Sequence, residues 1–234
     1  MELVALRWTP ARAFAMVAWA FLMLLAEGAA LRALGTGFWP GEGPHLARAV
    51  GAVVFYIAIV APVWFAARAE GLTLADAVGM RHFHVGPAVT LAILLVPVEW
   101  YVGVIWFNIL QAQHLRLPGR PSPIEFFGTS AVGVVLGLLV AGVVAPIAEE
   151  IIFRGVLFGQ LRRVWGEGAA VIVSALLFAA IHLNAVAFVP LAFVGVVLAL
   201  LFRRSGSLWG SILAHGIYNI ATFLIALAVT GIGR

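Results

Sequence analysis

Three charged residues lie close together in a strongly apolar part of the sequence: Glu149, Glu150 and Arg154. A charged side chain at the centre of a bilayer raises the free energy of insertion by roughly 2.5–3.5 kcal/mol, so such residues point to a site and a partner. On an α-helix, residues i and i+4 share a face, whereas adjacent residues point about 100° apart. We therefore expect Arg154 to hold Glu150 ionised, and Glu149 to point elsewhere, free to act as a general base. The alternative is a structural ion pair with a second acid that serves helix packing.

Two later apolar segments carry polar residues at helical spacing. His182 follows Phe178 by four residues in F-A-A-I-H, and His215 and Asn219 form the pair in H-G-I-Y-N. Taken singly, a histidine in such a helix is more often a hydrogen-bonded packing residue than a ligand. At 1.5 Å per residue, however, the three helices bring Glu149, both histidines and the asparagine to overlapping depth in a membrane. An acid, two imidazoles and a carboxamide at one depth predict hydrolytic chemistry.

The composition shows what kind of helices must position these groups. Hydrophobic residues make up 64% of the 234 residues and charged residues only 10%, against about 25% charged residues in soluble domains. The chain is therefore an integral membrane protein. Cysteine is absent, which excludes disulfides and thiolate metal sites. The net charge is +4, and all of its positive charges are arginines, because the sequence has no lysine. The arginines flank apolar segments, so we expect them to orient the chain in the membrane rather than to bind nucleic acid.

Seven segments are apolar enough to be membrane spans, for which about 20 residues are needed. The fifth is short, and the long fourth would give eight spans if it broke at Pro146. The segments are residues 13–31, 49–67, 85–110, 129–162, 168–183, 186–202 and 208–232. They predict an all-α, polytopic transmembrane helix bundle with its active site among the last four spans. We expect one integral-membrane domain over 1–234, with N-terminal spans in 1–125 and a catalytic core in 126–234.

The connections give the expected orientation. With the N-terminus inside, nine arginines fall on inner segments and five on outer ones, which favours a multi-pass protein of the cell membrane with a cytoplasmic N-terminus. The polar connector 68–84 predicts a short interfacial helix. Glu27 and Glu99 lie in the first and third spans, where lining a pocket, pairing with arginine and packing between helices are all open to them.

The polar groups resemble the three motifs of the CPBP family, the CAAX proteases and bacteriocin-processing enzymes, which includes the type II CAAX prenyl endopeptidases. The motifs E-E-x-x-x-R, F-x-x-x-H and H-x-x-x-N match residues 149–154, 178–182 and 215–219, in order and on separate apolar spans. The resemblance covers about residues 140–221. The N-terminal third shares only the general character of the family.

This resemblance implies a membrane-embedded endopeptidase. Glu149 and His182 would activate a water molecule for attack on a peptide carbonyl, and His215 and Asn219 would stabilise the oxyanion. The supporting residues would be Glu150, Arg154 and Phe178. Although the family is commonly labelled a metalloprotease, the motifs fit a glutamate-driven mechanism that needs no cofactor, which is our first expectation. Zinc held by Glu149, His182 and His215 is the alternative.

The expected partners are the lipid bilayer and a membrane protein or peptide substrate, which for eukaryotic members of the family is a prenylated CAAX protein. Nucleic acid is not expected, and the sequence selects neither the substrate nor the oligomeric state. Two other hypotheses stay open. One is a non-catalytic membrane protein that provides immunity or acts as a scaffold, and the other is a transporter in which Glu149 relays protons.

Overall fold

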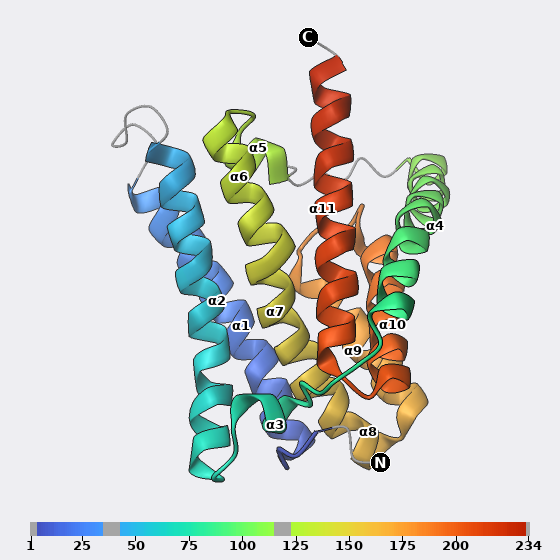
Figure 1. Cartoon of the computed structure of the whole chain (residues 1–234). Helices are drawn as coiled ribbons and strands as arrows, with labels where there is room; N and C mark the ends of the chain where they lie inside the picture. Colours follow the sequence, from blue (N-terminus) through green and yellow to red (C-terminus); the bar gives the residue numbers. More distant parts are fainter. Residues whose placement is uncertain (1–3, 35–42, 115–122, 233–234) are drawn as a thin grey trace.

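The computed structural model describes residues 4–34, 43–114 and 123–232. Within these ranges the chain is helical and contains no strand, which confirms the predicted all-α fold. Six helices within these ranges are long and apolar enough to cross a membrane, and they form one bundle (Figure 1). They are α1 (Pro10–Leu34), α2 (Gly43–Ala69), α4 (Val85–Ala112), the continuous helix α6 to α8 (Ala131–Trp165), α10 (Phe188–Ser205) and α11 (Leu208–Ile232).

The remaining predicted span, 168–183, corresponds to α9 (Glu167–Ile181), which has 15 residues. A helix of this length is short for a hydrocarbon core about 30 Å thick, as the sequence led us to expect. The fourth span does not break at Pro146, because the helix continues through α7 (Ala145–Glu150). The described residues therefore do not contain an eighth span.

The long helix changes its hydrogen-bond pattern on both sides of the two glutamates. Wider π-helical turns, with bonds from residue i to residue i+5, occupy η2 (Val140–Val144) and η3 (Ile151–Phe158). Pro146 lacks an N–H, so the carbonyl of Gly142 would have no partner in a regular α-helix. Turns of this kind are rare and frequently mark functional sites. Motif spacing alone did not predict them.

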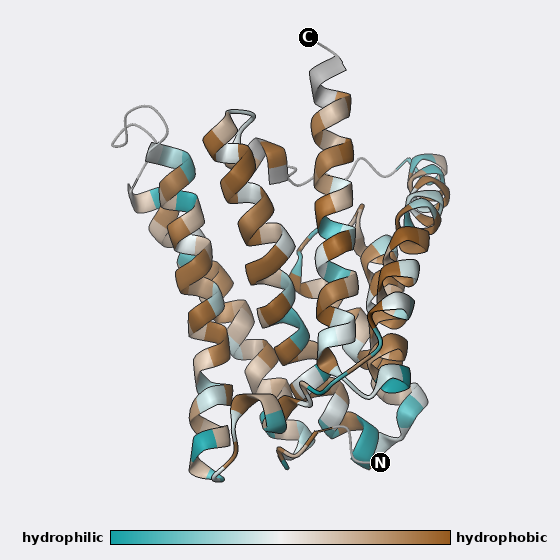
Figure 2. Ribbon diagram, in the orientation of Figure 1, coloured by the Kyte–Doolittle hydropathy of each residue, from teal (hydrophilic) through white to brown (hydrophobic). Residues whose placement is uncertain are grey.

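Most residues along the long helices are hydrophobic, and the hydrophilic ones lie near the helix ends and at a few positions within α7 and α11 (Figure 2). On α4, for example, the side chains of Leu94, Val98 and Trp100 are exposed. Backbone groups inside a bilayer must be satisfied within the segment, which helices achieve. The bundle is thus a multi-pass membrane protein, and the cytoplasmic N-terminus remains a prediction.

The short helix expected between the second and third spans is present as α3 (Leu74–Val78). The Thr73 hydroxyl accepts a hydrogen bond of 3.1 Å from the backbone N–H of Asp76 and caps the helix. Gly79 ends it in the left-handed conformation, with φ at 79°. The backbone N–H of Leu208 donates to the Gly79 carbonyl at 2.9 Å. This last bond attaches the end of α3 to the start of α11.

Candidate active site

A close contact between two glycines places α11 beside the long helix. A Cβ atom built on Gly216 would lie 2.5 Å from the carbonyl oxygen of Gly142. That distance is far shorter than van der Waals contact, so the approach requires glycine. His215 immediately precedes Gly216, and Asn219 follows on the same helix. The contact therefore holds both polar side chains against the helix that carries the two glutamates.

Glu150 is fully buried and accepts two hydrogen bonds on one oxygen. Nη1 of Arg154 lies 2.8 Å from Oε1 of Glu150, which confirms the contact predicted from their spacing. Nδ1 of His215 lies 3.0 Å from the same oxygen. Arg154 also donates from Nη2 to the carbonyl of Gly195 on α10, at 3.0 Å. Spacing within one helix did not predict this contact of Glu150 with His215, which follows from the close approach of α11.

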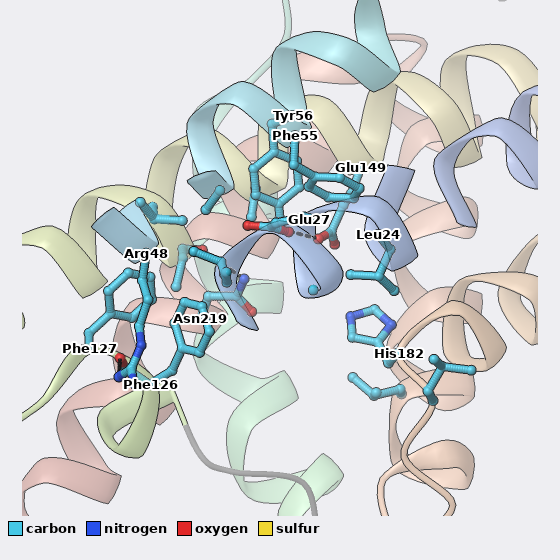
Figure 3. Close-up of a pocket in the computed structure, with 18 of the residues that line it drawn as sticks. Leu24, Glu27, Arg48, Phe55, Tyr56, Phe126, Phe127, Glu149, His182 and Asn219 are labelled. Carbon is cyan, nitrogen blue, oxygen red and sulfur yellow. Dashed lines mark hydrogen bonds between the residues drawn. The ribbon is translucent and has the colours of Figure 1, made fainter. Parts of the chain in front are cut away.

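Glu149 points into a cavity, where two other helices supply its neighbours. Its Oε1 accepts a hydrogen bond of 3.0 Å from the hydroxyl of Tyr56 on α2 (Figure 3). Its Oε2 lies 3.8 Å from Nε2 of His215. The Glu149 side chain is 15% exposed, whereas that of Glu150 is 0% exposed. Of the two carboxylates, Glu149 is therefore the one that water can reach.

His182 lies at the C-terminal end of α9. Its Nδ1 is 2.7 Å from the carbonyl oxygen of Phe178. A carbonyl oxygen only accepts hydrogen bonds, so Nδ1 carries the hydrogen, and Nε2 is the acceptor in the neutral ring. Because His182 lines the cavity, this nitrogen is suited to accept a hydrogen bond from water.

Phe178 packs among these polar groups. Its ring centroid lies 4.9 Å from that of His182 and 5.7 Å from that of His215. The guanidinium carbon of Arg154 lies 4.6 Å from the same centroid, within range of a cation–π interaction. One buried ring thus fixes the orientation of both imidazoles and of the arginine that holds Glu150.

All four residues predicted to be catalytic line the same cavity, which has a volume of about 1170 Å³. Small-molecule sites usually enclose about 300–1,000 Å³, so this one has room for a stretch of peptide. The four residues are Glu149, His182, His215 and Asn219. Nδ2 of Asn219 donates to the carbonyl of Ala141 at 2.8 Å. An amide nitrogen carries two hydrogens, so one remains for a ligand.

The first two spans complete the cavity, although the sequence located the site among the last four. Glu27 on α1 and Tyr56 on α2 both line it. Motif reasoning missed Tyr56, whose signal in the sequence is a phenol within an apolar segment, where its hydroxyl needs a partner. Of the roles left open for Glu27, the structure shows that it lines the pocket. Glu99 does not line this cavity and is hydrogen-bonded to Tyr218.

The zinc-binding set given as the alternative, Glu149, His182 and His215, is not a preassembled cluster in the described part of the chain. Within residues 4–34, 43–114 and 123–232, no three His, Cys, Asp or Glu side chains are grouped so as to hold a metal ion. Nδ1 of His215 bonds to Glu150, and its Nε2 faces Glu149. The effect of a chelator on activity tests the zinc alternative.

Comparison with known proteins agrees with the three motifs. Residues 131–221 match the family model described as type II CAAX prenyl endopeptidase Rce1-like, which confirms the resemblance. An "Uncharacterized 24.3 kDa protein" of Escherichia coli is 31% identical over 130 residues, which are 51% of this chain and 60% of that protein. The "Putative membrane peptidase YdiL" of Bacillus subtilis (strain 168) is 32% identical over 94 residues, 40% of this chain and 38% of that protein. The matches thus span less than two thirds of either relative. No solved structure matches the chain significantly.

Proposed function

We propose that this chain, whose residues 131–221 match the Rce1-like type II CAAX prenyl endopeptidases, is an intramembrane endopeptidase. It would hydrolyse peptide bonds of membrane-associated proteins or peptides. The observation that carries the proposal is the cavity inside an apolar bundle into which Glu149, His182, His215 and Asn219 project together. The peptidase name of the Bacillus relative supports the same class of activity.

In the proposed reaction, a water molecule lies between Glu149 and His182. Glu149 takes a proton from this water while the water oxygen adds to the carbonyl carbon of the peptide. Tyr56 bonds to Oε1 of Glu149, which leaves Oε2 to receive the proton. The tetrahedral intermediate then collapses, the C–N bond breaks, and Glu149 returns the proton to the departing amine. One water is consumed, and a carboxylate and an amine are formed.

The negative charge on the carbonyl oxygen requires hydrogen-bond donors. The second amide hydrogen of Asn219 is one candidate. The other is Nε2 of His215, on the ring edge opposite the Nδ1 atom that lies 3.0 Å from Oε1 of Glu150. Loss of one such donor typically lowers kcat by about 10²–10³.

The substitution Glu149→Gln tests the proposal directly. Glutamine keeps the size of the side chain and can still accept a hydrogen bond from Tyr56, but it cannot take a proton from water. General-base catalysis contributes about 10²–10⁴ in rate, so we expect at least a hundredfold loss in cleavage of a membrane peptide by purified protein. The unfolding midpoint should stay close to that of the wild type.

Glu99→Gln is the matched control, since Glu99 lies in a span but does not line the cavity. Wild-type activity in Glu149→Gln would contradict the proposal. Cleavage is also measured with a chelator, where we expect an unchanged rate. A loss that zinc reverses would contradict the role of Glu149 as the base. Substrates can then be sought as membrane proteins whose cleavage products disappear from cells carrying Glu149→Gln.

A further inference from the structure

We propose that Glu27 on α1 binds a cationic side chain of the substrate, a lysine or an arginine close to the bond that is cleaved. The inference rests on the proposed function and deepens it, because it names a residue type that a preferred cleavage sequence contains. Glu27 lies outside the segment 131–221 and belongs to none of the three motifs.

Glu27 is an acid in an apolar helix without a partner in its own chain. It lines the cavity and is partly buried. In the part of the chain that the structure describes, no group donates a hydrogen bond to Glu27 and no cation forms an ion pair with it. Acids within membrane spans normally pair with another group or mark the path of a substrate. We therefore expect the partner of Glu27 to come from a ligand.

Two arginines also line the cavity, but neither neutralises Glu27. Nη1 of Arg48 donates to the carbonyl of Phe126 at 2.5 Å, and the guanidinium lies 5.3 Å from the centroid of the Phe126 ring. Phe126 belongs to the short helix α5 (Pro123–Phe127). Arg32 follows Glu27 by five residues on α1, which places the two side chains about 140° apart around the helix.

The carboxyl group of Glu27 lies close to the catalytic groups. Its Oε1 is 3.4 Å from a Cβ atom built on Gly51, so the side chain reaches the surface of α2. Figure 3 shows Glu27 beside Tyr56, whose hydroxyl donates to Glu149 at 3.0 Å. The four-carbon stem of a lysine is about as long as two residues of an extended chain. The cation that meets Glu27 should therefore lie within two residues of the cleaved bond.

Electrostatics favour a cation over a neutral side chain at this position. Glu27 and Glu149 face the same cavity, and a positive charge beside Glu27 reduces the repulsion between the two carboxylates. Lysine and arginine also form charge-assisted hydrogen bonds with a carboxylate. An apolar substrate residue would instead take water from Glu27 without replacing its hydrogen bonds, which disfavours such a substrate.

The position of Glu27 along α1 suits a cation that arrives from the membrane surface. Glu27 is seven residues from the end of α1 at Leu34, which is about 10 Å along the helix axis. Lysine and arginine near the end of a membrane segment keep their charge toward the surface while their stems lie along apolar groups. The geometry thus favours cleavage close to the end of a membrane segment that carries a basic residue.

A cycle of two enzymes and two peptides tests the role of Glu27. A membrane peptide that the wild type cleaves is synthesised with lysine, or with acetyl-lysine, at each of the two positions on either side of the cleaved bond. Acetylation removes the charge and keeps the stem. Hydrogen bonds to charged groups are stronger than neutral ones, so at one or more positions we expect the wild type to prefer lysine by roughly 10- to 100-fold in kcat/KM, in uncharged detergent micelles.

Glu27→Gln should cleave the lysine and acetyl-lysine peptides about equally. If Glu27 only supports the fold, or relays protons, the substitution lowers both rates by the same factor, and that result would overturn the proposal. Glu99→Gln is the matched control, since Glu99 also lies within a span but does not line this cavity. This variant should keep the preference for lysine. A control variant that loses the preference as well would contradict binding at Glu27.

The remaining outcomes separate this inference from the proposed function. Equal cleavage of the two peptides by the wild type at every position overturns the role of Glu27 and leaves the endopeptidase intact. All peptides carry a blocked N-terminus, and a preference that appears only when this terminus is free would identify the terminal ammonium as the ligand and overturn the assignment to a side chain. A wild type that acts on every membrane substrate no faster than Glu149→Gln contradicts both.

Discussion

Glu149 and Glu150 are neighbours in the chain but lie in different surroundings. Glu150 is fully buried, and Arg154 and His215 both bond to its Oε1. Glu149 lines the cavity and bonds to Tyr56. The division follows from the angle between adjacent residues on a helix, which directs one carboxylate to the arginine and the other to open space. One acid is therefore suited to hold charge in place, and the other to exchange protons with water.

Arg154→Met should destabilise the protein strongly, because it leaves the carboxylate of Glu150 buried without its cationic partner. Breaking a buried ion pair in this way costs about 3–5 kcal/mol. The double variant with Glu150→Gln carries neither charge and should regain most of the lost stability. Denaturant titration of the detergent-purified variants measures both values. A double variant as unstable as the single one would contradict the view that the uncompensated charge causes the loss.

At the scale of helices, the site depends on how closely α11 approaches the long helix. In Gly216→Ala, the new Cβ would meet the carbonyl oxygen of Gly142 at 2.5 Å, so α11 must move away. A displacement of about 1 Å can lower a catalytic rate 10²-fold. We therefore expect a large loss of kcat/KM for a cleaved membrane peptide, with the helical circular dichroism unchanged.

Gly86→Ala on α4 is the matched control for Gly216→Ala. A Cβ atom built on Gly86 has nothing within 4 Å. Alanine in a helix is favoured over glycine by up to about 1 kcal/mol where space allows. This variant should therefore keep full activity and be at least as stable as the wild type. Equal activity of both alanine variants would show that the glycine contact does not position the site.

The sequence predicted those parts of the site that depend on helical geometry alone. The contact between Glu150 and Arg154 needs only a spacing of four residues, and α11 begins and ends where its apolar segment does. The bond from Tyr56 to Glu149 joins residues 93 positions apart. It depends on which faces of α2 and α7 pack together, and spacing within one segment does not encode that. The contact of His215 with Glu150 escaped prediction for the same reason.

At the scale of the whole molecule, the cavity joins both halves of the chain. The residues predicted to be catalytic lie within the segment 131–221, whereas Glu27, Arg48 and Tyr56 come from α1 and α2. The early helices thus do more than anchor the protein. They supply the wall on which we expect the substrate to lie. We therefore expect relatives that cleave different substrates to differ in the residues of these two helices.

The chain that precedes α1 holds the ends of several helices together. The backbone N–H groups of Ala5 and Leu6 donate to carbonyls in α3, at 3.3 and 3.2 Å. Gln160 of α8 (Gly159–Trp165) is fully buried between this segment and the core. Its Nε2 donates to the carbonyl of Leu6 at 2.8 Å, and its Oε1 accepts from the backbone N–H of Trp8 at 3.0 Å. One amide thus bonds to the segment through both of its polar atoms.

Gln160→Leu should therefore lower the stability of the whole bundle and leave the chemistry intact. Leucine fills the space but leaves the N–H of Trp8 without its acceptor, which costs about 1–3 kcal/mol for a buried group. Gln160 does not line the cavity, so kcat/KM should match the wild type below the unfolding temperature. Gln111→Leu, at an exposed position near the end of α4, is the control and should change neither value. Thermal unfolding and peptide cleavage measure the two effects, and a loss of activity at an unchanged midpoint would mean that the segment acts on the site rather than on the fold.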